Sequence, residues 1–279
     1  MGKVISAAII LLSTIGIVAW YYVQHEPPKD SSTVIPTKGV TQTEPVDNPG
    51  GIKLTPMAEV TSAPTPTRSV TVSNVQIIDS QPVQLYFPVS ITSNTPLIVY
   101  SHGSNEHVTE DEPTPAFFAE AIKTYGDYFV EKGAIFVASE MYGENWGSSE
   151  SVDHLNTVIE TIRSRNNLTS ATYLYGFSMG GLPTLRFAKA YPEQTTKVAL
   201  LAPTINMPDW DQSSIEQIKS IPIHIWHGSK DVNVPPSLSA EFFQTAQTYG
   251  HENIEREVVQ DEVHRHFLAP AKIWTFFTE

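Results

Sequence analysis

The chain has 279 residues, of which 41% are hydrophobic and 17% are charged, a composition typical of a globular protein with a substantial apolar core. Its formal net charge of −13 argues against nucleic acid as a partner, because an acidic surface repels phosphate backbones. The absence of cysteine excludes disulfides, thiolate metal sites and a cysteine nucleophile. No other metal-ligand spacing is visible, so we expect neither a metal nor a cofactor.

The chain begins with an uncharged stretch, residues 4–23, that follows Lys3. Twenty residues at about 1.5 Å each span roughly 30 Å, the thickness of the hydrocarbon core of a bilayer. We therefore predict that residues 1–23 are a membrane signal anchor or a signal peptide, with Ala19 as the candidate cleavage position. The lysine on the short N-terminal side favours an extracytoplasmic location for the rest of the chain, membrane-anchored, or secreted or periplasmic after cleavage.

Residues 24–69 contain eight of the 21 prolines, many Thr and Ser residues, and no apolar periodicity. Such a segment cannot bury enough apolar surface to offset the entropy cost of ordering. We predict a disordered tether over 24–69 and a folded domain over 70–279.

From residue 70 onward, short apolar runs alternate with amphipathic stretches. Strands are predicted over 69–78, 83–91, 96–103, 134–140, 171–178, 197–203, 221–228 and 253–259, and helices over 114–132, 151–165, 180–191, 238–250 and 267–277. The first two strands suit a hairpin, and the alternation that follows predicts a mostly parallel eight-stranded sheet with helices on both faces, an α/β fold. Residues 204–220 leave room for only a short helix, so no large cap domain is expected.

The stretch YLYGFSMGGLP, residues 173–183, places Ser178 between a predicted strand and a predicted helix. A serine on such a tight turn is exposed at the sheet edge, and the residues two before and two after it must be small because the flanking backbones approach closely. Gly176 and Gly180 meet that need. The alternative is a structural turn that happens to contain a serine.

A serine nucleophile needs a base, and the base needs an acid to orient it. His264 follows the last predicted strand and therefore lies at the same sheet edge, and His266 is its rival. Asp231 follows the strand 221–228 in the sequence WHGSKDVNVPP and is the candidate acid. Its alternative role is to cap the turn before the next helix.

A carbonyl oxygen that becomes negatively charged needs two backbone N–H donors. The first candidate is Met179, directly after the serine at the start of a helix. The second is Ser104, in the turn SHGSNE that ends the strand 96–103.

The order Ser178, Asp231, His264, with the motifs GFSMGG and HGSKDVNVP, resembles the α/β-hydrolase superfamily from about residue 70 to the end. Within that superfamily the chain resembles small serine esterases without a large lid, dienelactone-hydrolase-like enzymes and prolyl-oligopeptidase-like catalytic domains. The resemblance implies an α/β-hydrolase fold and a Ser-His-Asp triad. Many relatives have small residues before the histidine, whereas this chain reads QDEVHRH, which leaves the choice between His264 and His266 open.

Three activities remain open at this stage. The first is hydrolysis of carboxylic esters, small or polymeric, through an acyl-enzyme, and the second is peptide hydrolysis on the same fold. The third is a non-catalytic binding module, which the complete triad disfavours. Candidate substrate contacts are Asn145 and Trp146 in the loop GENWGSSES, and Trp210 in the 204–220 segment.

Overall fold

The computed structural model describes residues 72–108 and 116–279, which lie within one compact unit, Pro64–Glu279. The predicted membrane segment, 1–23, and the predicted tether, 24–69, lie outside the described residues and stay predictions. In the part of the chain that is described, no helix is both long enough and apolar enough to cross a membrane.

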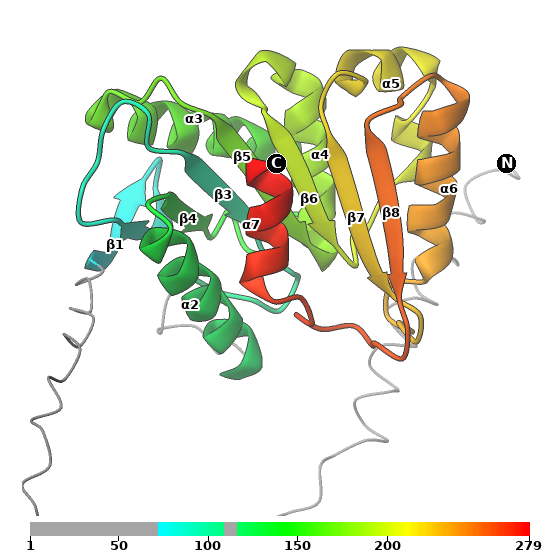
Figure 1. The fold of residues 1–279 in the computed structure, drawn as a ribbon, viewed down its shortest axis with the longest axis horizontal. Coiled ribbons are helices and arrows are strands. Elements are labelled where there is room, and N and C mark those ends of the chain that lie inside the picture. The colour runs from blue at the N-terminus through cyan, green and yellow to red at the C-terminus, as the bar shows by residue number, and fades with distance from the viewer. Residues whose placement is uncertain (1–71, 109–115) are drawn as a thin grey trace, which may run out of the picture. The chain divides into compact units, whose positions relative to one another are not determined.

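The core of the domain is one eight-stranded sheet with the strand order β1-β2-β4-β3-β5-β6-β7-β8 (Figure 1). The strands are β1 (Val72–Ile78), β2 (Gln81–Phe87), β3 (Leu97–Ser101), β4 (Ile135–Ser139), β5 (Thr172–Phe177), β6 (Lys197–Leu201), β7 (Ile223–Gly228) and β8 (Ile254–Val259). β1 and β2 form an antiparallel hairpin, β2 is also antiparallel to β4, and all remaining pairs are parallel. The predicted mostly parallel sheet is confirmed.

Helices cover both faces of the sheet (Figure 1). The helices are α2 (Ala116–Glu131), α3 (Ser149–Asn166), α4 (Gly181–Ala190), α5 (Gln212–Ile218), α6 (Pro236–Thr248) and α7 (Pro270–Thr278). Residues of α3, α4, α5 and α6 belong to one buried apolar cluster, and residues of α2 and α7 belong to the other. The sheet therefore separates two apolar cores, as the α/β prediction requires.

β3 shows how one strand serves both cores. All five of its residues are buried, because a parallel strand inside an α/β sheet is covered on both faces. Leu97 and Val99 belong to the cluster with α3 and α4, whereas Ile98 and Tyr100 belong to the cluster with α2 and α7. This alternation follows from the two-residue period of a strand.

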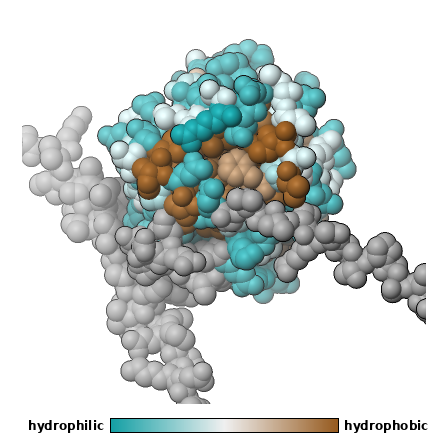
Figure 2. Space-filling view, turned by 90° about the vertical axis from the view of Figure 1, so that its left-hand side faces the viewer, coloured by the Kyte–Doolittle hydropathy of each residue, from teal (hydrophilic) through white to brown (hydrophobic). Residues whose placement is uncertain are grey.

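The edge strand β1 is covered less completely. Val75 and Ile77 are 47% and 67% exposed, whereas Ile78 is buried in the core. Val75 and Ile77 share one face of the strand because side chains alternate. Figure 2 shows this side of the molecule, where apolar residues gather among hydrophilic ones.

The connection between β6 and β7 holds only a 3₁₀ turn, Met207–Asp209, and the seven-residue helix α5. This short connection agrees with the expected absence of a large cap domain in this part of the chain. The carboxyl ends of the parallel strands are the edge at which the candidate site lies.

Candidate active site

Ser178 lies on the turn between β5 and α4, at the first position of a 3₁₀ turn, Ser178–Gly180. Its φ angle is 53°, in the left-handed region that residues with a Cβ rarely adopt. Such strain persists only where the surrounding structure enforces it, and it concentrates at functional sites. The strand-turn-helix context that the sequence predicted for Ser178 is present.

Two glycines permit this turn. A Cβ atom at Gly180 would lie 2.0 Å from the carbonyl oxygen of Ser101, at the end of β3. A Cβ atom at Gly176 would lie 2.8 Å from the carbonyl oxygen of Gly180. Neither position has room for a side chain, as we expected from the close approach of the two backbones.

His264 lies in the loop between β8 and α7, and both of its ring nitrogens make short contacts. Nε2 is 2.8 Å from Ser178 Oγ, and Nδ1 is 2.7 Å from Asp231 Oδ2. Because the carboxylate only accepts hydrogen bonds, Nδ1 carries the hydrogen and Nε2 accepts from the serine hydroxyl. This arrangement, and not one through His266, joins the three side chains that the sequence singled out.

Asp231 follows β7 and its side chain is fully buried. Its Oδ1 accepts hydrogen bonds from the backbone N–H groups of Asn233, at 3.0 Å, and Val234, at 2.8 Å. Burial opposes ionisation, but hydrogen bonds from His227, His264 and Val234 outweigh it and hold the pKa of Asp231 well below its ordinary value. The carboxylate therefore stays charged beside the imidazole, and the same residue also caps the turn, so its geometry is compatible with both of its candidate roles.

The two predicted N–H donors have different surroundings. Met179 is the second residue of the 3₁₀ turn that leads into α4, where the first N–H groups of a helix have no intrahelical acceptor. In the turn after β3, the N–H of Gly103 donates to Glu106 Oε2 at 2.6 Å. The N–H of Ser104 makes no hydrogen bond within the described part of the chain. The N–H of Asn105 makes none there either, so Ser104 and Asn105 are the residues between Gly103 and Glu106 whose N–H groups are open to a ligand.

Sequence reasoning missed Glu106. This residue is fully buried and pairs with His266, whose Nε2 lies 2.7 Å from Glu106 Oε1. Burial raises the pKa of Glu106, but the hydrogen bonds and charge of His266, together with Tyr100 and Gly103, give a net lowering. The rival histidine of the sequence analysis therefore has a partner of its own.

The three candidate substrate contacts differ in exposure. Trp210 is only 5% exposed and packs edge-on against Phe242 of α6, so the structure assigns it to the core. Asn145 uses its side chain inside its own loop, because its Oδ1 accepts from the N–H of Gly147 at 2.8 Å. Trp146 is 51% exposed and has surface available for a ligand.

Trp146 is held beside α4, the helix that follows the Ser178 turn. Its φ angle is 46°, a strained value for a bulky residue. A Cβ atom at the next residue, Gly147, would lie 2.7 Å from Cβ of Leu182, in the first turn of α4. Arg186 of α4 donates to the carbonyl oxygens of Trp146 and Gly147 and also forms an ion pair with Asp209 at 2.6 Å. Arg186 therefore ties this loop to the segment after β6.

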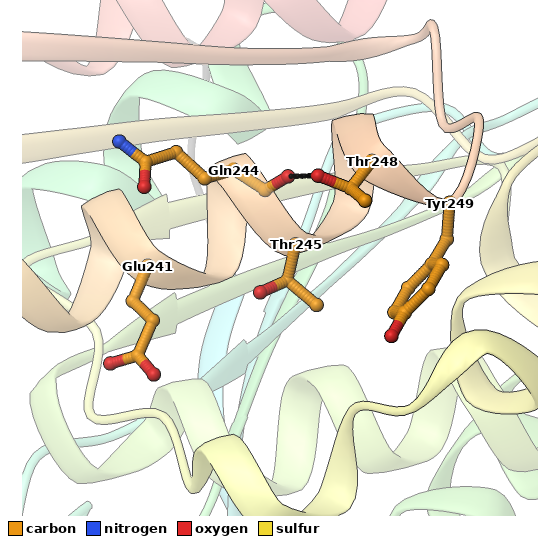
Figure 3. Close-up of a pocket in the computed structure, with 5 residues that line it drawn as sticks. All are labelled: Glu241, Gln244, Thr245, Thr248 and Tyr249. Carbon is orange, nitrogen blue, oxygen red and sulfur yellow. Dashed lines mark hydrogen bonds between the residues drawn. The ribbon is translucent and has the colours of Figure 1, made fainter.

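A hollow away from these residues lies along α6 and is lined by Glu241, Gln244, Thr245, Thr248 and Tyr249 (Figure 3). It includes none of the candidate site residues. Among residues 72–108 and 116–279, no group of three or more His, Asp or Glu side chains is arranged to hold a metal ion.

The eight-stranded sheet, the strained serine turn and the hydrogen-bonded Ser178, His264 and Asp231 define an α/β-hydrolase fold. Residues 87–269 match the model of a family described as phospholipase/carboxylesterase. The chain belongs to this family and is a hydrolase of the α/β-hydrolase superfamily. No curated protein matches the chain.

Similar solved structures include esterases and peptidases. Est1E from Butyrivibrio proteoclasticus has a TM-score of 0.54 and 16% identity, over 72% of this chain and 93% of that one. A ferulic acid esterase has a TM-score of 0.57 and 14% identity, over 75% and 97%. The acylaminoacyl peptidase of Pyrococcus horikoshii has a TM-score of 0.55 and 13% identity, over 74% of this chain but 39% of that one. At these identities the likeness shows the fold alone.

Proposed function

We propose that the protein is a serine hydrolase that cleaves carboxylic esters through an acyl-enzyme. The observation that carries this proposal is the continuous hydrogen-bonded chain from Asp231 through His264 to Ser178 Oγ, with contacts of 2.7 and 2.8 Å. The serine hydroxyl is a weak nucleophile by itself, and this geometry gives it a general base within hydrogen-bond reach.

In the acylation step, Ser178 Oγ attacks the ester carbonyl carbon while His264 Nε2 takes the hydroxyl proton. Asp231 stabilises the imidazolium that forms and holds the ring in the required tautomer. When the tetrahedral intermediate collapses, the carbon–oxygen bond to the alcohol breaks and His264 returns the proton to the leaving oxygen. The acyl group is then bonded to Ser178.

Deacylation repeats these steps with water. His264 takes a proton from the water that attacks the acyl carbonyl, and collapse of the second intermediate returns that proton to Ser178 Oγ and frees the acid. In both steps we propose that the N–H groups of Met179 and Ser104 donate hydrogen bonds to the negatively charged oxygen of the tetrahedral intermediate. Such donors are worth most where they point at the charge that develops in the transition state.

We assign Trp146 to the substrate side of the site. Its loop packs on the first turn of α4, one turn beyond Ser178, and its ring is half exposed although its backbone is fixed. An aromatic ring in this position suits the apolar part of a small ester, or one ester group of a polymer.

The test is activity-based labelling of the full chain with a fluorophosphonate, combined with turnover of p-nitrophenyl esters of increasing acyl length. We expect labelling and turnover in the wild type and neither in Ser178→Ala. A peptidyl p-nitroanilide series run beside the esters distinguishes the peptidase alternative, because a peptidase cleaves these amides at a measurable rate whereas an esterase cleaves only the more reactive esters. A folded wild type that neither labels nor turns over either series would overturn the proposal and favour a binding module.

A further inference from the structure

Glu106 and His266 form a second carboxylate–imidazole pair at the same sheet edge. Glu106 Oε1 accepts from His266 Nε2 at 2.7 Å, and Oε2 accepts from the Tyr100 hydroxyl at 2.5 Å and from the Gly103 N–H at 2.6 Å. The Glu106 side chain is fully buried and that of His266 is 5% exposed. Burial of a carboxylate is costly unless it is paired and hydrogen-bonded in this way. The pair therefore calls for an account of what it does at this place.

Aromatic side chains enclose this pair. The ring of His266 lies 3.9 Å, centre to centre, from the ring of Phe177, and its Nδ1 is 3.4 Å from the hydroxyl of Tyr175. The ring of Tyr125 lies 5.7 Å away. With side chains that are 5% exposed or less, the pair has little surface on which to meet a substrate.

The carboxylate of Glu106 fixes the shape of the turn that carries Ser104. It takes up the N–H of Gly103, and the N–H of Glu106 in turn donates to the carbonyl oxygen of Gly103 at 3.2 Å. A Cβ atom at Gly103 would lie 3.1 Å from the ring of Phe177, so this ring also confines the turn. Bonded in this way, Gly103 cannot serve as a donor to substrate, and Ser104 takes that role.

The other half of the pair lies on the loop of the general base. His266 is two residues after His264, and the ring of Phe177 packs on both, with centres 5.1 Å from His264 and 3.9 Å from His266. One carboxylate thus links the turn after β3 to the β8–α7 loop. We infer that Glu106 and His266 are positioning residues, which fix the position of the Ser104 N–H relative to the imidazole of His264. This inference rests on the proposed ester hydrolysis.

The kinetic test compares Glu106→Gln, Glu106→Ala and His266→Gln with the wild type, as full chains, on a short p-nitrophenyl ester. We expect kcat to fall about tenfold in Glu106→Gln, whose amide oxygen still accepts from Gly103, and about a hundredfold in Glu106→Ala, with KM within twofold. Removal of a direct oxyanion donor costs about 10²–10³ in kcat, and an indirect loss should be smaller. If Glu106→Ala does not fold, the Gln variants decide.

The matched control is Glu257→Gln, which removes a carboxylate of β8 that accepts hydrogen bonds from Trp226 and Lys272. Affinity for an alkyl boronic acid, which forms a tetrahedral adduct with a serine, should fall in the Glu106 variants by the same factor as kcat/KM. It should not change in Glu257→Gln. If both Gln variants at positions 106 and 266 keep kcat and boronate affinity within twofold, the pair only stabilises the fold and the inference is overturned.

A second readout does not depend on activity. Hydrogen exchange of the backbone amides in residues 101–108 should be at least tenfold faster in Glu106→Ala than in the control, because the Gly103 N–H loses its acceptor. It should also be faster in His266→Gln, because Glu106 loses the partner of its Oε1. If the variants show faster exchange but the wild type shows no ester turnover, the proposed function has failed, whereas the structural link from Glu106 to the turn that carries Ser104 stands. Unchanged exchange would overturn the positioning role even in an active esterase.

Discussion

Two turns of this domain have almost the same sequence, HGSNE at 102–106, directly after β3, and HGSKD at 227–231, which begins with the last two residues of β7. Each is closed by the equivalent backbone hydrogen bond, from the N–H of the acid to the carbonyl oxygen of the glycine, at 3.2 Å in the first and 3.3 Å in the second. Each acid pairs with a histidine of the β8–α7 loop at 2.7 Å, Glu106 with His266 and Asp231 with His264.

The two pairs differ in what the second nitrogen of each histidine meets. For His264 it is the hydroxyl of Ser178 at 2.8 Å, and for His266 it is the hydroxyl of Tyr175 at 3.4 Å. Burial raises the pKa of Tyr175 well above its ordinary value, so this phenol keeps its proton. The same acid and base types therefore make a candidate catalytic pair in one place and a pair with a proposed positioning role in the other.

The largest difference between the two pairs is expected when each histidine is replaced. His264→Gln removes the proposed base, and we expect kcat to fall by about 10⁴ or more, as when a triad member is lost. His266→Gln should cost about tenfold to a hundredfold. Rates for p-nitrophenyl butyrate measured on both variants check this order, and equal losses would contradict the assignment of separate roles.

Replacement of Asp231 should likewise lower kcat more than replacement of Glu106. Asp231→Asn leaves His264 in the wrong tautomer, and we expect a loss in kcat of about 10³–10⁴ that high pH partly restores. Glu106→Gln should lose about tenfold without such a pH-dependent recovery. Complete pH–rate profiles of kcat for both variants provide the measurement, and a recovery at high pH in Glu106→Gln would place that residue in proton transfer.

Both acids should also contribute to stability at neutral pH. Folding lowers the pKa of each carboxyl below its ordinary value, about 3.8 for Asp231 and 4.5 for Glu106. Their contribution is therefore present above those ordinary values and is lost as the pH falls below them. Urea unfolding at pH 6 and pH 3.5 should show a smaller acid-induced loss in Glu106→Gln than in the wild type. The exposed control Glu241→Gln should keep the full loss.

The smallest effect is expected at Trp146, which belongs to neither turn. Trp146→Gly relieves the left-handed φ of 46°, so the free energy of unfolding should stay within about 1 kcal/mol of the wild type or rise. KM for esters with aromatic or long acyl groups should increase several-fold, with little change for acetate esters. An equal increase for all acyl lengths would mean that Trp146 does not contact the acyl group.

Much of the fold follows from local pattern. The eight strands appear where apolar runs predict them, although the strand expected over 83–91 ends at Phe87, because Pro88 has no N–H to continue the ladder. Helix α3 begins at Ser149, before the predicted 151, because the side chain of Ser148 accepts from the N–H of Ser151 and caps it.

The site was predictable only where its chemistry has a fixed local spacing. The small residues around Ser178 and the HGSKD turn carry such spacing. Glu106 and His266 are 160 residues apart, and no local pattern pairs them. The position of Trp210 in the 204–220 segment, where a lid usually enters this fold, allows either substrate contact or packing. Its packing partner, Phe242, comes from a distant helix, which the sequence around Trp210 does not reveal.

The left-handed conformation of Ser178 restricts how this position can change during evolution. Threonine also has a hydroxyl, but a β-branched residue at φ 53° is a genuine outlier, so Ser178→Thr would disturb the turn before any chemistry is tested. Cysteine has no branch at Cβ and fits the same backbone. If Ser178 is replaced by another nucleophilic residue, backbone geometry and not reactivity therefore favours a thiol over another alcohol.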